Sequence, residues 1–178
     1  MGGQPHAVVV REIRDREIDE LARITLAAYE QLGFDLGTYR PSLVDVAGRA
    51  AAATVLVAVD GDRLVGGVTY VGDRDNPYAE FTDDDAAGIR MLAVAPDAQG
   101  LGVGSALVIA CLHRAAADHR RRVVLHTTTD MAAAQRMYDR LGFRRTPERD
   151  WKPQPHVLLH GYEMPVGTVV VSQRTVDP

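Results

Sequence analysis

The feature that most constrains the fold is an apolar strand that leads through a proline and a glycine-rich turn directly into a helix. The strand is predicted over residues 89–95 and the helix from Gly104 to about Asp118. Glycines at positions 100, 102 and 104 remove Cβ at alternate positions, so the chain can take unusual φ and ψ angles and a ligand can approach its backbone. The start of the helix presents unpaired N–H groups and the positive end of its dipole. The sequence therefore predicts a site where backbone amides bind an anion such as phosphate.

The other elements alternate between strands and helices along the chain. Alternating and β-branched residues predict further strands at 8–13, 54–59, 64–70, 123–127, 143–146 and 157–164. Apolar residues at helical spacing predict further helices at 18–32 and 43–53, and one with Asp130 as its N-cap that ends at Gly142. Asp60-Gly61-Asp62 predicts a hairpin turn. This order predicts a single α/β domain with a mixed sheet over residues 1–165, followed by a tail over 166–178 in which 169–171 forms an edge strand or an oligomer contact, consistent with a homodimer.

Composition excludes several classes of protein. The 178 residues, 46% of them apolar and 25% charged, are typical of one ordinary globular domain. The longest apolar run, 103–112, is shorter than a membrane span, and MGGQPH lacks the features of a signal peptide, so a cytoplasmic location is expected. A net charge of −4 argues against a nucleic-acid partner. Cys111 is the single cysteine and is expected to be a buried filler, and no set of residues has the spacing of a metal site.

Two familiar nucleotide motifs do not match the glycine turn. A P-loop requires lysine and then serine or threonine after its last glycine, whereas Gly104 is followed by Ser105 and Ala106. A dinucleotide fold requires Gly-x-Gly-x-x-Gly/Ala and an acidic residue after the next strand, whereas that strand ends in His126-Thr127-Thr128. On these residues alone, the alternative interpretation remains that the segment is a tight turn that binds no ligand.

The turn and its surroundings resemble a known family. Gln99-Gly-Leu-Gly102-Val-Gly104 matches the Gln/Arg-x-x-Gly-x-Gly/Ala signature of the GNAT superfamily of acyl-CoA-dependent N-acyltransferases. Leu-Ala-Val-Ala-Pro stands immediately before it, and Ala134-x-x-Met-Tyr138-x-x-Leu-Gly-Phe143 resembles the family's downstream Ala-x-x-Leu-Tyr-x-x-Leu-Gly-Phe element. The resemblance is strong over residues 89–143 and weaker over most of the chain. It implies a mostly antiparallel mixed sheet, flanked by helices, with a splayed central strand pair.

The resemblance also implies a donor and residues that bind it. The donor would be acetyl-CoA, with its pantetheine arm paired to the strand backbone and its pyrophosphate held by the amides of the turn. The strand residues concerned are Leu92, Ala93 and Val94, and the turn residues are Gln99, Gly100, Leu101, Gly102, Val103, Gly104 and Ser105. Met131 stands where the family often has an asparagine that contacts pantetheine, and Thr128, Thr129 or Asp130 are alternatives for that contact.

The implied reaction transfers an acetyl group to a primary amine, in a small molecule or a peptide, by direct attack within a ternary complex. The resemblance assigns the oxyanion-binding amide to Leu92 and the proton donor to Tyr138, which equally suits a core position beside Met137 and Leu141. Glu80 is the candidate base, because it leads into the strand that would carry the acyl group. The neighbouring residues 83–85, all aspartate, would either attract a cationic acceptor or form a solvated loop.

Acceptor specificity is expected from variable segments and stays open. The candidates are the loop at 33–41 with Tyr29 and Tyr39, and the last hairpin around Trp151 and His156, although the aromatic residues suit packing equally well. The remaining histidines, His126 among them, are interpreted as surface or local structural residues. A non-catalytic acyl-CoA-binding or sensing domain is the alternative to an enzyme, and both hypotheses predict that coenzyme A binds.

Overall fold

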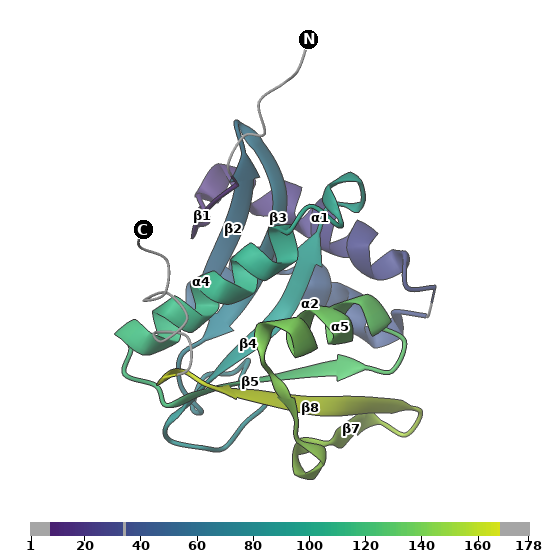
Figure 1. The fold of residues 1–178 in the computed structure, drawn as a ribbon. Coiled ribbons are helices and arrows are strands. Elements are labelled where there is room, and N and C mark those ends of the chain that lie inside the picture. Colours follow the sequence, from purple (N-terminus) through teal and green to yellow (C-terminus); the bar gives the residue numbers. More distant parts are fainter. Residues whose placement is uncertain (1–7, 34, 168–178) are drawn as a thin grey trace. The chain divides into compact units, whose positions relative to one another are not determined.

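The computed structural model describes residues 8–33 and 35–167 (Figure 1). These residues form two compact units, the first containing 8–33, 35–70 and 91–110, the second 71–90 and 111–167. One strand, β4 (Ala86–Val94), and one helix, α4 (Val103–Ala117), each contribute residues to both units. Residues 168–178, with the strand predicted at 169–171, lie outside the described residues, as does the N-terminal MGGQPH.

The first unit contains the strands of the predicted hairpin. Its strands pair in the order β1 (Val9–Glu12), β2 (Thr54–Asp60), β3 (Arg63–Val71, as far as Tyr70) and the second half of β4. Both β1 and β3 run antiparallel to β2. Asp60 pairs with Arg63 across a turn in which Gly61 has a φ of 60°. The hairpin predicted from Asp60-Gly61-Asp62 is therefore confirmed.

Besides the first turns of α4, the described residues of the first unit form six helical segments. They are η1 (Asp15–Glu17), α1 (Ile18–Glu30), η2 (Gly37–Tyr39), α2 (Arg40–Val44), α3 (Val46–Ala52) and η3 (Pro96–Ala98). Leu21 of α1 and Val46 of α3 pack with residues of β2 and β3 in one core cluster, Val55, Val57, Val59 and Leu64. Burying a leucine of this kind contributes about 2 kcal/mol.

The single helix predicted at 43–53 is wrong, because the structure has two helices that meet at Asp45. This residue leaves the helical conformation, with a φ of −77° and a ψ of 63°, and its carboxylate accepts a hydrogen bond from the Gly48 N–H at 2.9 Å. It thereby acts as the N-cap of α3. The buried Arg49 side chain donates to the carbonyls of Ser42 and Leu43, at 2.7 and 2.9 Å, and so caps the end of α2.

Two adjacent glycines of β3 allow close packing on both faces of the first unit's strands. A Cβ at Gly67 would lie 2.5 Å from the Leu21 side chain of α1. A Cβ at Gly66 would lie 2.7 Å from the Ala93 carbonyl oxygen of β4 and 3.3 Å from the Leu107 side chain of α4. Successive strand residues point to opposite faces, so α1 packs on one face here and the first turns of α4 on the other.

Glu17 fastens β1 to the start of α1. Its carboxylate accepts two hydrogen bonds from the Arg11 guanidinium, at 2.9 and 2.6 Å, and one from the Arg14 N–H at 2.9 Å. The bonds from Arg11, more than any other contact, lower the pKa of Glu17 from its usual value near 4.5 to about 2. A lowered pKa means that the native state holds fewer protons than the unfolded state in this range, so stability falls as the pH drops from about 4.5 towards 2.

The Glu17→Gln variant is therefore expected to be less stable than wild type by about 1–2 kcal/mol at pH 7, because the charge-assisted bonds are lost. Below about pH 2 the difference should disappear, since the wild-type carboxylate is then protonated too. Urea denaturation at several pH values measures this. Asp62→Asn, in the exposed β2–β3 turn, is the control and should change little. A stability difference that is independent of pH would contradict the assigned role.

The second unit pairs its strands in the order β4, β5 (Arg122–Thr128), β8 (Val157–Pro165) and β6 (Arg144–Arg145), with β7 (Trp151–Gln154) paired to β8. Strand β8 runs antiparallel to its three partners, whereas β4 and β5 are parallel. The parallel ladder extends only from the Ala86–Arg122 pair to the Ile89–Leu125 pair, although both strands continue. The mixed, mostly antiparallel α/β fold class is confirmed, and the short parallel ladder agrees with the expected splayed pair.

The helices of the second unit are the end of α4, then α5 (Ala132–Leu141) and η4 (Pro147–Arg149). Helix α5 packs on β8 through a ring contact between Tyr138 and Tyr162, whose centroids are 6.2 Å apart. The helix ends at Gly142 as predicted, with a φ of 96°. Its N-cap is Met131 instead of the predicted Asp130, and no side chain caps it. Strand β6 is shorter than predicted by one residue at each end, and η4 begins at Pro147.

Within residues 8–33 and 35–167, the helices are all too short or too polar to cross a membrane.

Candidate active site

The glycine turn of the first unit has the backbone conformation that the sequence predicts. Gly100 and Gly102 have φ values of 78° and 82°, which other residues rarely adopt, and a Cβ at either position would meet no atom within 4 Å. Leu101 between them is 72% exposed. Helix α4 begins at Val103, so Gly104 is its second residue. The turn is thus an open backbone surface at the N-terminus of a helix of 15 residues.

Gln99 fixes the start of this turn. Its side-chain N–H groups donate to the Gln31 side chain at 2.8 Å and to the Val94 carbonyl at 3.4 Å. The nearest acidic side chain before the turn, Asp97, is ion-paired with Arg63. Residues 99–105 contain no acidic side chain, so their N–H groups face no competing carboxylate of their own segment.

Strand β4 contains a strained residue that sequence analysis missed. Met91 has a φ of 52°, the left-handed region that a side chain normally avoids, and only His119 shares this among the other described non-glycine residues. Its side chain is buried in a cluster with Tyr29, Leu36 and Leu43, which holds the strained conformation in place. Leu92 follows directly, and Leu92 and Val94 are half-buried while Ala93 between them is buried. A left-handed residue within a strand is typical of a β-bulge, and no local sequence pattern revealed it.

Tyr138, in the second unit, combines a buried ring with an available hydroxyl. The residue is 5% exposed and its ring packs edge-on against Phe143, with centroids 5.6 Å apart. None of the described residues forms a hydrogen bond with its hydroxyl. Burial, and to a smaller degree the neighbouring Cys111, raises the pKa of Tyr138, so the phenol keeps its proton at neutral pH. Burial also raises the pKa of the Cys111 thiol, in agreement with an inert filler.

Glu80 lies in the loop before β4 and is held by two basic side chains. Its carboxylate is 3.0 Å from Arg90 Nη2 and 3.4 Å from His126 Nδ1. The Glu80 side chain is 15% exposed, and these three residues line a small pocket of about 10 Å³, the volume that one water molecule needs. No hydrogen bond or ion pair joins Glu80 to Tyr138 in the described part of the chain.

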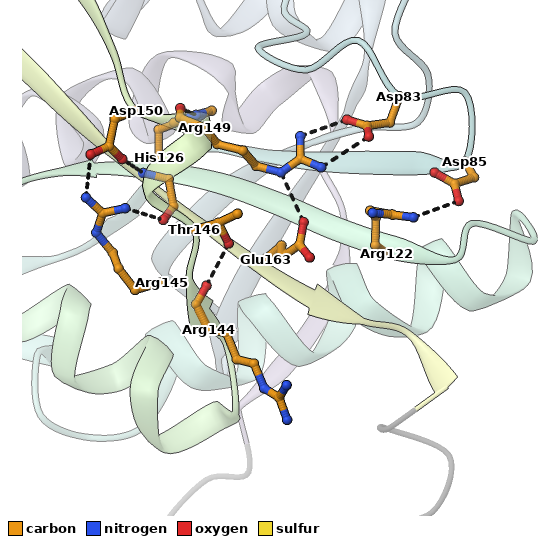
Figure 2. Close-up of polar contacts among 11 residues, drawn as sticks. Asp83, Asp85, Arg122, His126, Arg144, Arg145, Thr146, Arg149, Asp150 and Glu163 are labelled. Carbon is orange, nitrogen blue, oxygen red and sulfur yellow. Dashed lines mark hydrogen bonds and ion pairs between the residues drawn. The ribbon is translucent and has the colours of Figure 1, made fainter.

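Each of the three consecutive aspartates after Glu80 is paired with an arginine. Asp83 accepts from Arg149 at 2.7 Å, Asp84 from Arg74 at 2.9 Å and Asp85 from Arg122 at 3.1 Å. Figure 2 shows the Arg149 guanidinium between Asp83 and Glu163, which links the loop to β8. The bonds from Arg149 lower the pKa of Asp83. These contacts favour the structural interpretation of the acidic loop over the attraction of a cationic acceptor.

The other candidate residues differ in burial and in their contacts. In the first unit, Tyr29 and Tyr39 pack edge-on with ring centroids 6.2 Å apart, and the 33–41 loop is described except for residue 34. In the second unit, Trp151 is 40% exposed and His156 is exposed between β7 and β8. Thr128 Oγ1, at the end of β5, is buried and has no hydrogen-bond partner among the described residues. An unpaired buried hydroxyl is costly, so Thr128 is favoured over Thr129 and Asp130 among the alternatives for a side-chain contact to pantetheine.

Comparison with known proteins decides the family. The model of the acetyltransferase (GNAT) family matches residues 16–143, which contain the glycine turn, β4, Glu80 and Tyr138. The chain belongs to the GNAT family. This confirms the family predicted from the glycine signature and from the Tyr138 element.

Relatives and solved structures extend the comparison. Mycothiol acetyltransferase of Actinosynnema mirum is 37% identical over 105 residues, covering 58% of this GNAT chain but 31% of the relative. Its counterpart in Geodermatophilus obscurus is 34% identical over 93 residues, covering 52% of this chain and 29% of the relative. The matched region thus spans less than a third of either relative.

Two solved structures show the same fold at low identity. A GNAT acetyltransferase of Staphylococcus aureus has a TM-score of 0.72 and 16% identity, covering 90% of this chain and 99% of its own. A Salmonella typhimurium structure, solved with its cofactor acetyl-CoA, has a TM-score of 0.67 and 19% identity, covering 90% of this chain and 94% of its own.

Proposed function

We propose that this GNAT-family chain transfers an acetyl group from acetyl-CoA to a primary amine, by direct attack within a ternary complex. The observation that carries the proposal is the glycine turn. Its two left-handed glycines, Gly100 and Gly102, leave an open backbone surface at the start of α4. Such a surface suits a diphosphate, because N–H groups and the helix dipole both favour negative charge there. The amides from Gln99 to Ser105 would hold the pyrophosphate.

The strand before the turn would hold the thioester end of the donor. Pantetheine carries amides, which can pair with the backbone of Leu92, Ala93 and Val94. The left-handed conformation of Met91 supports this assignment, because such a residue is typical of a β-bulge, which redirects the backbone groups of the residues next to it. In this proposal the Leu92 N–H donates to the oxyanion that forms when the amine attacks the thioester carbonyl.

Tyr138 would supply the proton for the departing thiolate. When the tetrahedral intermediate collapses, the C–S bond breaks and the sulfur takes a proton from the phenol. Burial raises the pKa of Tyr138, so the donor is in its protonated form throughout the neutral range. Its hydroxyl has no hydrogen-bond partner to give up among the described residues.

Glu80 would remove the proton from the acceptor. An alkylammonium with a pKa near 10.4 has to become a neutral amine before it can attack. The Glu80 carboxylate is largely buried and retains access to the small pocket that it lines with Arg90 and His126. That pocket has room for the one water through which a proton could also pass.

An assay of thiol release with acetyl-CoA and a panel of small and peptide amines tests the function. Wild type is expected to acetylate at least one amine, and Glu80→Gln to lower kcat/KM for it by about 100-fold at pH 7, the contribution of a general base. Glu148→Gln, an exposed residue of η4, is the matched control and should behave as wild type. Full activity of Glu80→Gln would exclude Glu80 as the base. Coenzyme A binding without turnover of any amine would favour an acyl-CoA-binding or sensing domain.

A further inference from the structure

The inference concerns His126, a residue of β5 that no part of the proposed function uses. Its side chain is only 3% exposed. The imidazole edge contacts two oxygen atoms, because Nδ1 lies 3.4 Å from the Glu80 carboxylate and Nε2 lies 2.9 Å from the Arg149 carbonyl (Figure 2 shows His126 and Arg149). The Trp151 ring packs edge-on against it, with centroids 6.4 Å apart. Each ring nitrogen thus contacts an oxygen atom of the protein.

These two contacts determine where the imidazole carries its protons. A carbonyl oxygen can only accept a hydrogen bond, so Nε2 carries a proton that it donates to Arg149. In a neutral imidazole, Nδ1 then has a lone pair directed at the Glu80 carboxylate, and two acceptors face each other across 3.4 Å. One additional proton turns this repulsion into a hydrogen bond. The Oε2···Nδ1 contact is therefore a place where one additional proton can be bound.

We propose that Glu80 and His126 act together as the base of the transfer reaction, with His126 as the positioning residue that receives, through Glu80, the proton lost by the acceptor ammonium. This rests on the proposed function, in which Glu80 is the base. An N–H bond of the ammonium breaks and an O–H bond forms on Glu80. That proton moves into the Oε2···Nδ1 contact, where the imidazole binds it while Nε2–H keeps its bond to Arg149. Attack by the neutral amine releases a second N–H proton, which replaces the one that Tyr138 gives to the thiolate.

The charges around the pair are consistent with this role. Arg90 pairs with the other Glu80 oxygen, at 3.0 Å, so Oε2 is the oxygen that faces His126. The nearby Arg149 guanidinium forms ion pairs with Asp83 and Glu163. Asp150 forms an ion pair with Arg145. Among the ionised side chains of these segments, Glu80 is the one that contacts the His126 ring.

The test compares His126→Gln with wild type across pH, because glutamine keeps an N–H donor for the Arg149 carbonyl but cannot take up the proton. With an amine from the panel, kcat/KM of His126→Gln is expected to be about 10-fold below wild type at pH 7. The ratio of wild type to His126→Gln should fall as the pH rises and approach one only above the pKa of the amine, near 10.4, where the amine arrives already neutral. The exposed histidine of α4 gives the matched control, His113→Gln, which should follow wild type at every pH.

Two further measurements separate a proton-accepting role from a structural one. The double variant with Glu80→Gln should be no slower than Glu80→Gln alone, because both changes remove the same function. Histidine ¹⁵N spectra of the free protein should show His126 with its proton on Nε2, and its Nδ1 signal should change in Glu80→Gln.

A wild-type to His126→Gln ratio that stays constant with pH, fully additive effects in the double variant, or a proton on Nδ1 with none on Nε2 would each overturn the inference while leaving the proposed function intact. Full activity of Glu80→Gln, or no turnover of any amine by wild type, would overturn the assigned base or the transfer itself, and the inference with it.

Discussion

The Gly102→Glu variant is expected to bind coenzyme A at least about 100-fold more weakly than wild type while remaining folded. Gly102 has a φ of 82°, so a side chain there strains the backbone at the centre of the turn, at a cost of about 1–2 kcal/mol. The added carboxylate also places negative charge where the pyrophosphate is proposed to bind, so repulsion adds to the strain. Isothermal titration calorimetry with coenzyme A measures the affinity, and thermal denaturation checks the fold.

Gly61→Glu is the matched control for this substitution. Gly61 has a φ of 60° in the β2–β3 turn, and a Cβ there meets nothing within 4 Å, as at Gly102. The two variants therefore carry the same side chain on a similarly strained backbone, and they differ in position. Gly61→Glu should lose some stability and keep its affinity for coenzyme A. Equal affinities of wild type and Gly102→Glu would rule out the turn as the pyrophosphate site.

Tyr138→Phe is expected to lower kcat by about 100-fold and to leave the affinity for coenzyme A unchanged, because the variant loses a proton donor and no binding contact. The raised pKa of Tyr138 has a consequence for the pH profile. A phenol whose pKa lies above the usual value of 10 stays protonated through the alkaline range, so wild-type activity should show no decline from tyrosine ionisation below pH 10. Stopped assays of thiol release from pH 6 to pH 10 measure both effects.

Tyr162→Phe provides the comparison, since Tyr162 is also a buried tyrosine and its ring contacts that of Tyr138. Removal of its hydroxyl should leave turnover near the wild-type level, because it is not assigned to the reaction. Unchanged turnover in Tyr138→Phe, or an equal loss in both variants, would show that Tyr138 is a core residue and that the proton comes from elsewhere.

The parts of the fold that local sequence specifies were predictable. The Asp60-Gly61-Asp62 hairpin and the end of α5 at Gly142 depend on residues that take left-handed conformations in short turns. The family signature around Gln99 and the element around Tyr138 gave the family correctly. These signals lie within a few residues of the structure that they determine.

The features that were missed depend on contacts between distant segments. Met91 holds a left-handed conformation because residues of α1, α2 and the loop between them bury its side chain. The role proposed for His126 depends on contacts of its two ring nitrogens with Glu80 and with the Arg149 carbonyl, each more than 20 positions away in the sequence. A histidine that follows three apolar residues inside a strand was the one available signal. Asp45 at the junction of α2 and α3 could have been recognised as an N-cap.

The adjacent glycines of β3 have a consequence for how substitutions in this chain should be interpreted. A methyl group at Gly67 would collide with Leu21, and one at Gly66 with the Ala93 carbonyl, so neither position tolerates even alanine without a shift of backbone or core. The Gly66 collision falls on β4, the strand proposed to bind pantetheine. Loss of activity after substitution of Gly66 would thus reflect displaced donor-binding backbone. A glycine with no chemical role of its own would then resemble a functional residue in a mutational scan, and stability measured alongside activity distinguishes the two.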